Sequence, residues 1–279
     1  MDIQELLARY DRGETNFENI DLHGQILGNI NLSRANLKES DLSGISLVGC
    51  SLIETNLKSC NIDKGTIKGD LTGINLIKAI LTDADLSDSD LTDASLRAAN
   101  LTGCNLSNSK LICALLHDTI LKDANLLNAQ MMNSLLSRAN LSGANLSGAN
   151  LQGSNLTNAL LLNTNLEGAN LSLAQLNSVN AVGVNAHLAN FSHANLSAGN
   201  FASGIFTNAN LADTMITWAS LRSADFTNAN FSGAKLSWSN FLRANLTHAN
   251  LSDAQINNTN FENTTLDQTR INDQSSNLI

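Results

Sequence analysis

A five-residue period runs through nearly the whole chain and restricts it to a small set of folds. In the stretch ANLSGANLSGANL, residues 139–151, the same five letters return without change. We define the large apolar residue of each unit as its centre. Centres recur every five residues over Phe17–Ile67 and, after the loss of one residue near Lys68–Asp70, over Leu71–Ile271, which gives 52 centres. A fixed short period is typical of solenoids, in which each repeat packs only on its neighbours.

The apolar residues are confined to two positions of the unit. Of the 41 centres from Leu71 onward, 28 are Leu, 7 Phe, 3 Ile, 1 Met and 2 Ala, and all 8 Phe of the chain are centres. Two positions before the centre the residue is usually small, as at Ala94, Ala99 and Cys104. Residues two apart in extended chain share a face. The pattern therefore predicts that both positions point inward and that the other three point outward.

The residue just before the centre is Asn or Asp in 25 of the same 41 units. These side chains bond readily to nearby backbone and tolerate turn conformations. Identical Asn side chains in successive layers can also form hydrogen-bonded ladders. We therefore expect each unit to form one side and one corner of a coil.

The A-N-L-S-G unit resembles the repeat of the pentapeptide-repeat family over residues 15–273. The resemblance implies an all-β solenoid, a right-handed quadrilateral β-helix with four repeats per coil. It also implies about 13 coils and, at roughly 4.8 Å per layer, a length of about 62 Å. The opening of the chain resembles that of some cyanobacterial members.

Residues 1–14 do not follow the repeat and are predicted to form a short capping helix, which begins near Asp2 and ends near Gly13. Its apolar residues have the spacing of one helical face: Ile3, Leu6, Leu7 and Tyr10. A cap that covers the first coil is a general need of solenoids. A helix that binds a partner is the alternative.

Several residues of unusual size occupy inward positions. Large or polar residues stand where small ones are usual at Ile20, Gln25, Ile30, Ile45 and Ile74, so the first coils should be irregular. The residue lost near Lys68–Asp70 is expected to tighten one corner. Farther along, Val179 and Val184 precede the two Ala centres, Ala181 and Ala186, which indicates an exchange of volume.

The repeat ends without a second helix. The residues after Ile271, which include the predicted tail (residues 274–279), contain no further helix pattern. Phe261 and Leu266 should therefore lie near an open end. An exposed apolar end favours self-association, and the resemblance makes a homodimer through this end plausible.

Two outward groups are candidates for partner binding. Trp218 and Trp238, the only tryptophans, are twenty residues apart at the same position of the unit and should stack one layer apart, beside Met215 and Lys235. Aromatic residues with a basic neighbour often anchor interfaces; a ladder that only shields the side wall is the alternative.

The second group is expected to form an exposed apolar patch on adjacent faces: Ile112, Leu115, Met132 and Leu135. A contiguous patch can mark a partner or dimer surface, whereas isolated exposed apolar residues mean little.

Nothing in the sequence indicates an enzyme, a metal site or a cofactor. No two histidines have metal-ligand spacing on a helix, and no phosphate-binding or nucleophile motif occurs. The acidic run should wrap around corners without forming a calcium site: Asp83, Asp85, Asp88, Asp90 and Asp93. His193 and Asp213 are expected to form a surface ion pair one layer apart.

The spacing of the four cysteines is not that of a metal site: Cys50, Cys60, Cys104 and Cys113. No export signal or membrane span is evident, so we expect a cytoplasmic protein in which these thiols are reduced.

Two functions are compatible with these features. The first is a non-catalytic interaction or regulatory protein that presents flat faces to an unidentified protein partner. The second, implied by the resemblance, is a mimic of DNA that binds and protects a type II topoisomerase such as gyrase. The net charge of −9 makes nucleic acid an improbable ligand. It is also small for a mimic, because duplex DNA of about 62 Å carries roughly 36 charges.

Overall fold

The computed structural model describes residues 3–271, so Asp2 and the predicted tail, residues 274–279, lie outside the described residues. The chain forms two compact units, unit 1 (Met1–Asn140) and unit 2 (Leu141–Ile279). Each unit is a β-helix built of stacked coils. Parallel bridges join residues twenty positions apart, such as Asn105 to Asn125 in unit 1 and Asn170 to Asn190 in unit 2. Four five-residue units therefore make one coil, as the resemblance implied.

The predicted inward positions form the core of both units. Leu146 is a centre and Ala144 precedes it by two residues, and both are 0% exposed. The residues that separate these pairs are half-buried or exposed in nearly every repeat from Leu71 onward. The register read from the sequence is confirmed.

Nearly every corner is a tight turn with one residue in the left-handed region. At a typical corner the N–H of Ala194 donates to the carbonyl oxygen of Phe191 at 2.9 Å, and His193 between them has a φ of 59°. A turn of this kind needs a positive φ at its third residue, where Gly, Asn and Asp are favoured. The corner position is therefore the one place in the repeat where a bulky residue has a conformational cost.

The Asn residues before the centres form the predicted ladders. Asn190 Oδ1 accepts the backbone N–H of Ser192 at 3.1 Å and the Nδ2 group of Asn210 at 3.1 Å. Asn190 Nδ2 in turn donates to Asn170 Oδ1 at 3.3 Å. One amide thus fixes its own corner and binds the coils before and after it.

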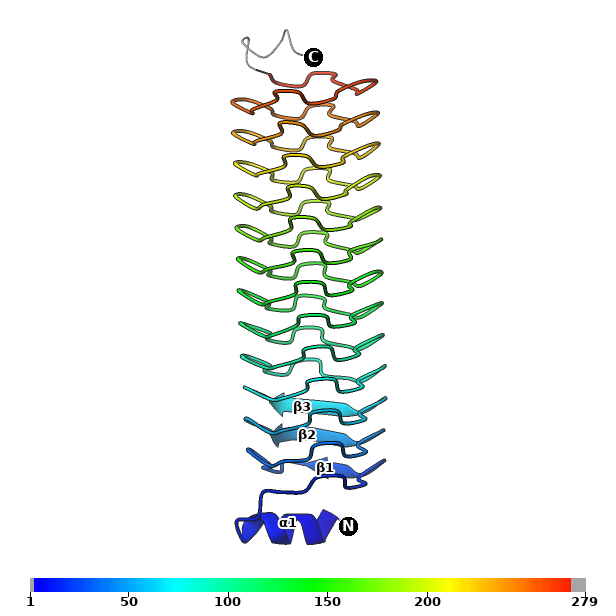
Figure 1. Ribbon diagram of the computed structural model, residues 1–279, viewed down its shortest axis with the longest axis vertical. Helices are drawn as coiled ribbons and strands as arrows, with labels where there is room; N and C mark the ends of the chain where they lie inside the picture. Colours follow the sequence, from blue (N-terminus) through cyan, green and yellow to red (C-terminus); the bar gives the residue numbers. More distant parts are fainter. Residues whose placement is uncertain (1–2, 272–279) are drawn as a thin grey trace. The chain divides into compact units, whose positions relative to one another are not determined.

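Helix α1 (Ile3–Asp11) lies beside the first coil of unit 1 (Figure 1). Leu6 is 0% exposed, and the hydroxyl of Tyr10 donates to the carbonyl oxygen of Ser33 at 2.8 Å. The guanidinium of Arg9 lies over the ring of Phe17 at 5.5 Å. The helix predicted from the spacing is present and packs its apolar face on the coil.

Three short strands stack in parallel near the start of unit 1, in the order β1-β2-β3 (Figure 1). They are β1 (Ile26–Gly28), β2 (Ser46–Ser51) and β3 (Thr66–Asp70). The expected irregularity of the first coils is located here.

The residue missing near Lys68–Asp70 does not tighten a corner, so that prediction was wrong. Instead β3 runs through the corner as continuous strand, and the register with β2 shifts between Val48 and Cys50. Gly69 has a φ of 143°, and a Cβ there would collide with the carbonyl oxygen of Cys50. The strand β2 also runs through this corner, and the close approach of β3 to it requires glycine at position 69.

The prediction of inward side chains was also wrong for part of the first coil. Gln25 is exposed and Ile20 and Ile30 are only half-buried, whereas Ile45 and Ile74 are buried as expected. A residue in an end coil has a neighbouring coil on one side only. Burial at these positions therefore becomes complete only from the second coil onward.

The exchange of volume in unit 2 takes place between neighbouring coils. Val184 is 1% exposed, and its Cγ1 atom lies 3.1 Å from where a Cβ on Gly204 would stand. The small centre Ala186 is followed twenty residues later by Phe206, whose ring packs on Phe226 with centroids 4.9 Å apart. A large residue in one coil is thus matched by a small one in the next.

Candidate protein-binding surface

Trp218 and Trp238 form a parallel stack at one corner of unit 2. Their ring centroids are 4.9 Å apart and their planes differ by 3°. The predicted stacking one layer apart is therefore confirmed. Trp218 is 65% exposed and Trp238 is 51% exposed, so most of the pair remains in contact with solvent.

Both tryptophans occupy left-handed corner positions, with φ values of 60° and 64°. A bulky residue in this region costs about 1–2 kcal/mol relative to glycine. Because both rings remain largely exposed to water, burial compensates little of this cost. Gly and Asn are the residues that most readily adopt this conformation, so the turn itself does not require tryptophan at these corners.

Met215 and Lys235 lie on the side that leads into this corner. They are bridge partners in adjacent coils, and Met215 is 42% exposed. Between Met215 and the first tryptophan, Thr217 Oγ1 donates to Ser197 Oγ at 3.0 Å. The structure thus brings all four residues of this predicted group together on one surface.

The second predicted group is less exposed than expected. Ile112, Leu115, Met132 and Leu135 are each half-buried. Leu115 and Leu135 are bridge partners, so each covers part of the other. The four side chains face outward on adjacent coils as predicted, and each is only partly exposed because stacked side chains of equal size shield one another from water.

Sequence reasoning missed two exposed leucines at corner positions of unit 2. Leu173 and Leu188 are 52% and 57% exposed and have φ values of 62° and 58°. Both stand two positions after a centre, as the tryptophans do. A search of this position of the repeat for large apolar residues could therefore have identified them. They occupy corners of their own in the repeat and do not stack.

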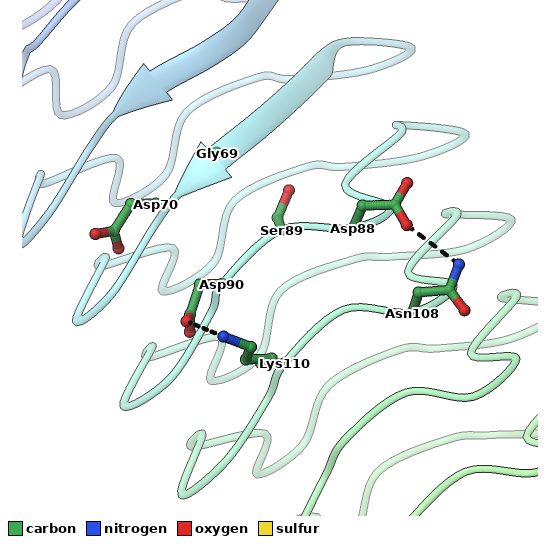
Figure 2. A pocket seen from close by; sticks show the side chains of 7 residues that line it. All are labelled: Gly69, Asp70, Asp88, Ser89, Asp90, Asn108 and Lys110. Atoms are coloured by element: carbon green, nitrogen blue, oxygen red, sulfur yellow. Dashed lines mark hydrogen bonds and ion pairs between the residues drawn. The ribbon is translucent and has the colours of Figure 1, made fainter.

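A polar hollow of about 290 Å³ lies in unit 1 where the chain lacks one residue. Figure 2 shows Asp90 pointing toward Lys110 and Asp88 toward Asn108 across adjacent coils. Lys110 Nζ lies 3.0 Å from Asp90 Oδ2, and Asn108 Nδ2 donates to Asp88 Oδ1 at 3.1 Å. The remaining lining residues are Gly69, Asp70 and Ser89.

The acidic run of unit 1 wraps around corners as predicted, with Asp83, Asp88 and Asp93 at left-handed positions. Partial burial opposes ionisation of Asp90, but hydrogen bonds from Thr92 and Lys110 outweigh it and lower the pKa. Among residues 3–271 no group of three or more acidic, His or Cys side chains is placed to hold a metal ion.

Histidines of the outer wall pair with the next coil. His193 Nδ1 lies 3.9 Å from Asp213 Oδ2, so the two side chains meet one layer apart as predicted. His117 Nδ1 is 2.5 Å from Ser137 Oγ, and burial together with Arg97 and Arg138 lowers the pKa of His117.

The four cysteines are free thiols. Cys50, Cys60 and Cys104 are buried, and Cys113 is exposed. Over the part of the chain that the structure describes, α1 is too short and too polar to cross a membrane.

The comparisons with known proteins agree on the repeat. The family of pentapeptide repeats (8 copies) matches in contiguous and overlapping segments from residue 15 to residue 268. No curated protein gives a significant match.

Three solved structures are similar to the chain. HetL, a pentapeptide repeat protein involved in heterocyst differentiation regulation from the cyanobacterium Nostoc sp. strain PCC 7120, is 27% identical, with 98% of each chain covered and a TM-score of 0.33. A pentapeptide repeat protein from the thylakoid lumen of Arabidopsis thaliana is 29% identical over 42% of this chain and 71% of its own, with a TM-score of 0.29. QnrB1, a plasmid-mediated fluoroquinolone resistance protein, is 14% identical over 94% of this chain and 96% of its own, with a TM-score of 0.32.

The TM-scores of these three structures are low, so the assignment rests on the repeat itself. The matched segments cover the β-helical coils of both units and leave out only the helix and the last residues. The chain belongs to the pentapeptide repeat family, whose members form right-handed β-helices.

Proposed function

We propose that this chain is a non-catalytic interaction protein that regulates a protein partner by binding it on a flat side-chain surface. The observation that carries the proposal is the exposed stack of Trp218 and Trp238. The stack has a conformational cost at its corners and buries little area, and aromatic residues dominate the energy of protein interfaces. Binding of a partner supplies the burial that the free protein lacks.

Other features of the molecule are compatible with this function. Regular coils hold the side chains of a surface in fixed positions, so little entropy is lost when a partner binds. Three of the four thiols are buried and unpaired, which suits a reducing cytoplasm. The quadrilateral helix of about 13 coils stays a prediction, as does the homodimer through the C-terminal end.

The experiment compares capture of partners by two matched variants. Trp218→Ser/Trp238→Ser removes the stack, and Leu173→Ser/Leu188→Ser removes two exposed apolar residues from other corners of unit 2. Native lysate of the source cell is passed over each immobilised protein, and retained proteins are identified by mass spectrometry. We expect one partner to be lost from the tryptophan variant and retained by the leucine variant, with unchanged circular dichroism in both.

The same experiment tests the DNA-mimic alternative. Retention of gyrase or topoisomerase IV subunits by all three proteins would favour a mimic and contradict the proposed surface. The structure gives one reason to expect otherwise: Lys68 and Lys110 neutralise Asp85 and Asp90 in the densest acidic run, at 2.8 Å and 3.0 Å.

A further inference from the structure

The basic residues of unit 2 gather around the tryptophan stack. Unit 2 contains four Lys and Arg residues, and three of them belong to the two coils that carry the tryptophans. Lys235 lies on the side that leads into the corner, whereas Arg222 and Arg243 lie in the turns of the next corner along the coil, where Arg243 has a φ of 60°. All three are exposed.

These three cations have no ion-pair partner among residues 3–271, in contrast to those of unit 1. Eight Lys and Arg residues of unit 1 lie within ion-pair distance of a carboxylate: Arg9, Arg34, Lys38, Lys64, Lys68, Lys110, Lys122 and Arg138. Neither side that flanks the tryptophan corner has an Asp or Glu in the two coils. The surface is therefore positive on a chain whose net charge is −9.

The stack leaves one ring face open. Ala198 occupies the same corner one coil before Trp218, has a φ of 57°, and donates its N–H to the carbonyl oxygen of Thr217 at 2.8 Å. A methyl group cannot cover an indole ring, and Trp218 is the more exposed of the pair, at 65% against 51% for Trp238. A planar side chain placed above Ala198 would extend the stack by one layer.

We propose that this surface binds an acidic segment of a protein partner, with an aromatic side chain of that segment stacked on Trp218 above Ala198. Lys235 lies before the corner and Arg222 and Arg243 lie after it, so carboxylates on either side of the aromatic residue would each meet a cation. This inference rests on the proposed function and specifies the chemistry of the partner.

A peptide fits the surface better than a nucleic acid, which also combines planar groups with negative charge. The two coils span only about 10 Å, so the positive surface is short. A longer polyanion would extend past it toward a chain that is acidic overall, where like charges repel. An acidic segment with a few carboxylates can end where the cations end.

The test uses the intrinsic fluorescence of the full chain, because its only two tryptophans are both in this surface. The probe is a short glutamate-rich peptide with one central phenylalanine. We expect it to change the tryptophan emission and to bind at least about tenfold more tightly than the same peptide with lysines or with alanine at its centre. Binding should weaken as salt is raised.

Matched charge reversals complete the test. Lys235→Glu and Arg222→Glu should each weaken the peptide severalfold, whereas Arg270→Glu, which reverses the remaining exposed cation of unit 2, should leave its affinity unchanged. Equal binding of the lysine peptide, or no effect of Lys235→Glu and Arg222→Glu, would overturn the inference.

Two further outcomes separate this inference from the proposed function. Tighter binding of an oligothymidylate than of the peptide would overturn it in favour of nucleic acid. If the Trp218→Ser/Trp238→Ser variant loses a lysate partner but Lys235→Glu does not change peptide binding, the proposed interaction surface stands. The proposal of an acidic partner is then refuted.

Discussion

Replacement of Gly204 by alanine tests the matching of volume between coils. Gly204 does not have a positive φ, so alanine can adopt its backbone conformation. The added Cβ would stand 2.7 Å from Phe206 Cε2, 3.1 Å from Val184 Cγ1 and 3.1 Å from the carbonyl oxygen of Phe201. The first distance is too short for carbon atoms, so one of the neighbours must move.

The neighbour that would have to move is held on several sides. Phe206 is 0% exposed, and its ring lies 4.9 Å from that of Phe226, 5.8 Å from that of Phe191 and 6.0 Å from that of Phe201. Overpacking of such a core costs about 1–3 kcal/mol. Changing Gly to Ala also lowers the entropy of the unfolded chain, which stabilises the folded state by about 0.4–1 kcal/mol. We expect Gly204→Ala to lower the free energy of unfolding by about 1–2 kcal/mol.

The assay is guanidinium unfolding followed by circular dichroism. Phe206→Leu removes the Cε2 atom, so Gly204→Ala/Phe206→Leu should cost less than the sum of the two single changes. Gly28→Ala is the control, because its Cβ would lie 3.6 Å from the carbonyl oxygen of Val48, an ordinary contact. A Gly204→Ala protein as stable as the parent, or a double variant with strictly additive losses, would refute the account of paired volumes.

Three other predictions concern the core, the thiols and a surface pair. Leu146→Asp should abolish cooperative melting or lower stability by about 3 kcal/mol or more, because the leucine is 0% exposed; a soluble variant with unchanged melting would show that the register is wrong. In the native protein at neutral pH, Ellman's reagent should modify Cys113 alone, since burial raises the pKa of the Cys60 thiol to about 11; a second thiol reacting at the same rate would contradict this. Arg138 binds Asp118 through two hydrogen bonds of 2.7 Å and holds the pKa of that carboxyl below its usual value, so the stability from this pair is present above the unfolded pKa and lost as pH falls through the folded one. Arg138→Gln should move the carboxyl titration measured by NMR back toward the ordinary value, and an unchanged titration would exclude Arg138 as the cause.

The sequence was sufficient for features that depend only on the repeat. The period determines which residues point inward, so the burial of Leu146 and the alignment of Trp218 with Trp238 could be predicted from spacing. The helix of residues 3–11 was found because its apolar residues follow a period different from that of the coils. Each of these features is local to one repeat or to two repeats at a fixed distance.

Other features depend on the neighbouring coil and could not be read from spacing alone. The lost residue near Gly69 could have produced a tighter corner or a straight strand, and the backbone of β2 beside it decides between them. Ile112 and Met132 were expected to be exposed, but stacking reduces the exposure of both. The position of a side chain in its repeat gives its direction, whereas its exposure depends on the size of the residues twenty positions away.

The bridges join residues twenty positions apart, or nineteen across the missing residue, and this regular spacing has a consequence for how the chain folds. Within each unit a residue pairs with another about 0.07 of the chain length away, a separation more usual for helical bundles than for β proteins. The entropy of loop closure is therefore the same small cost for every coil, and a coil can form as soon as its predecessor is in place. Growth on the ribosome could begin at the helix and advance as each new coil emerges. The loss of a residue from one repeat likewise has only a local effect. The residue missing at β3 alters its own corner and the adjoining strand, and the five-residue period resumes at Leu71.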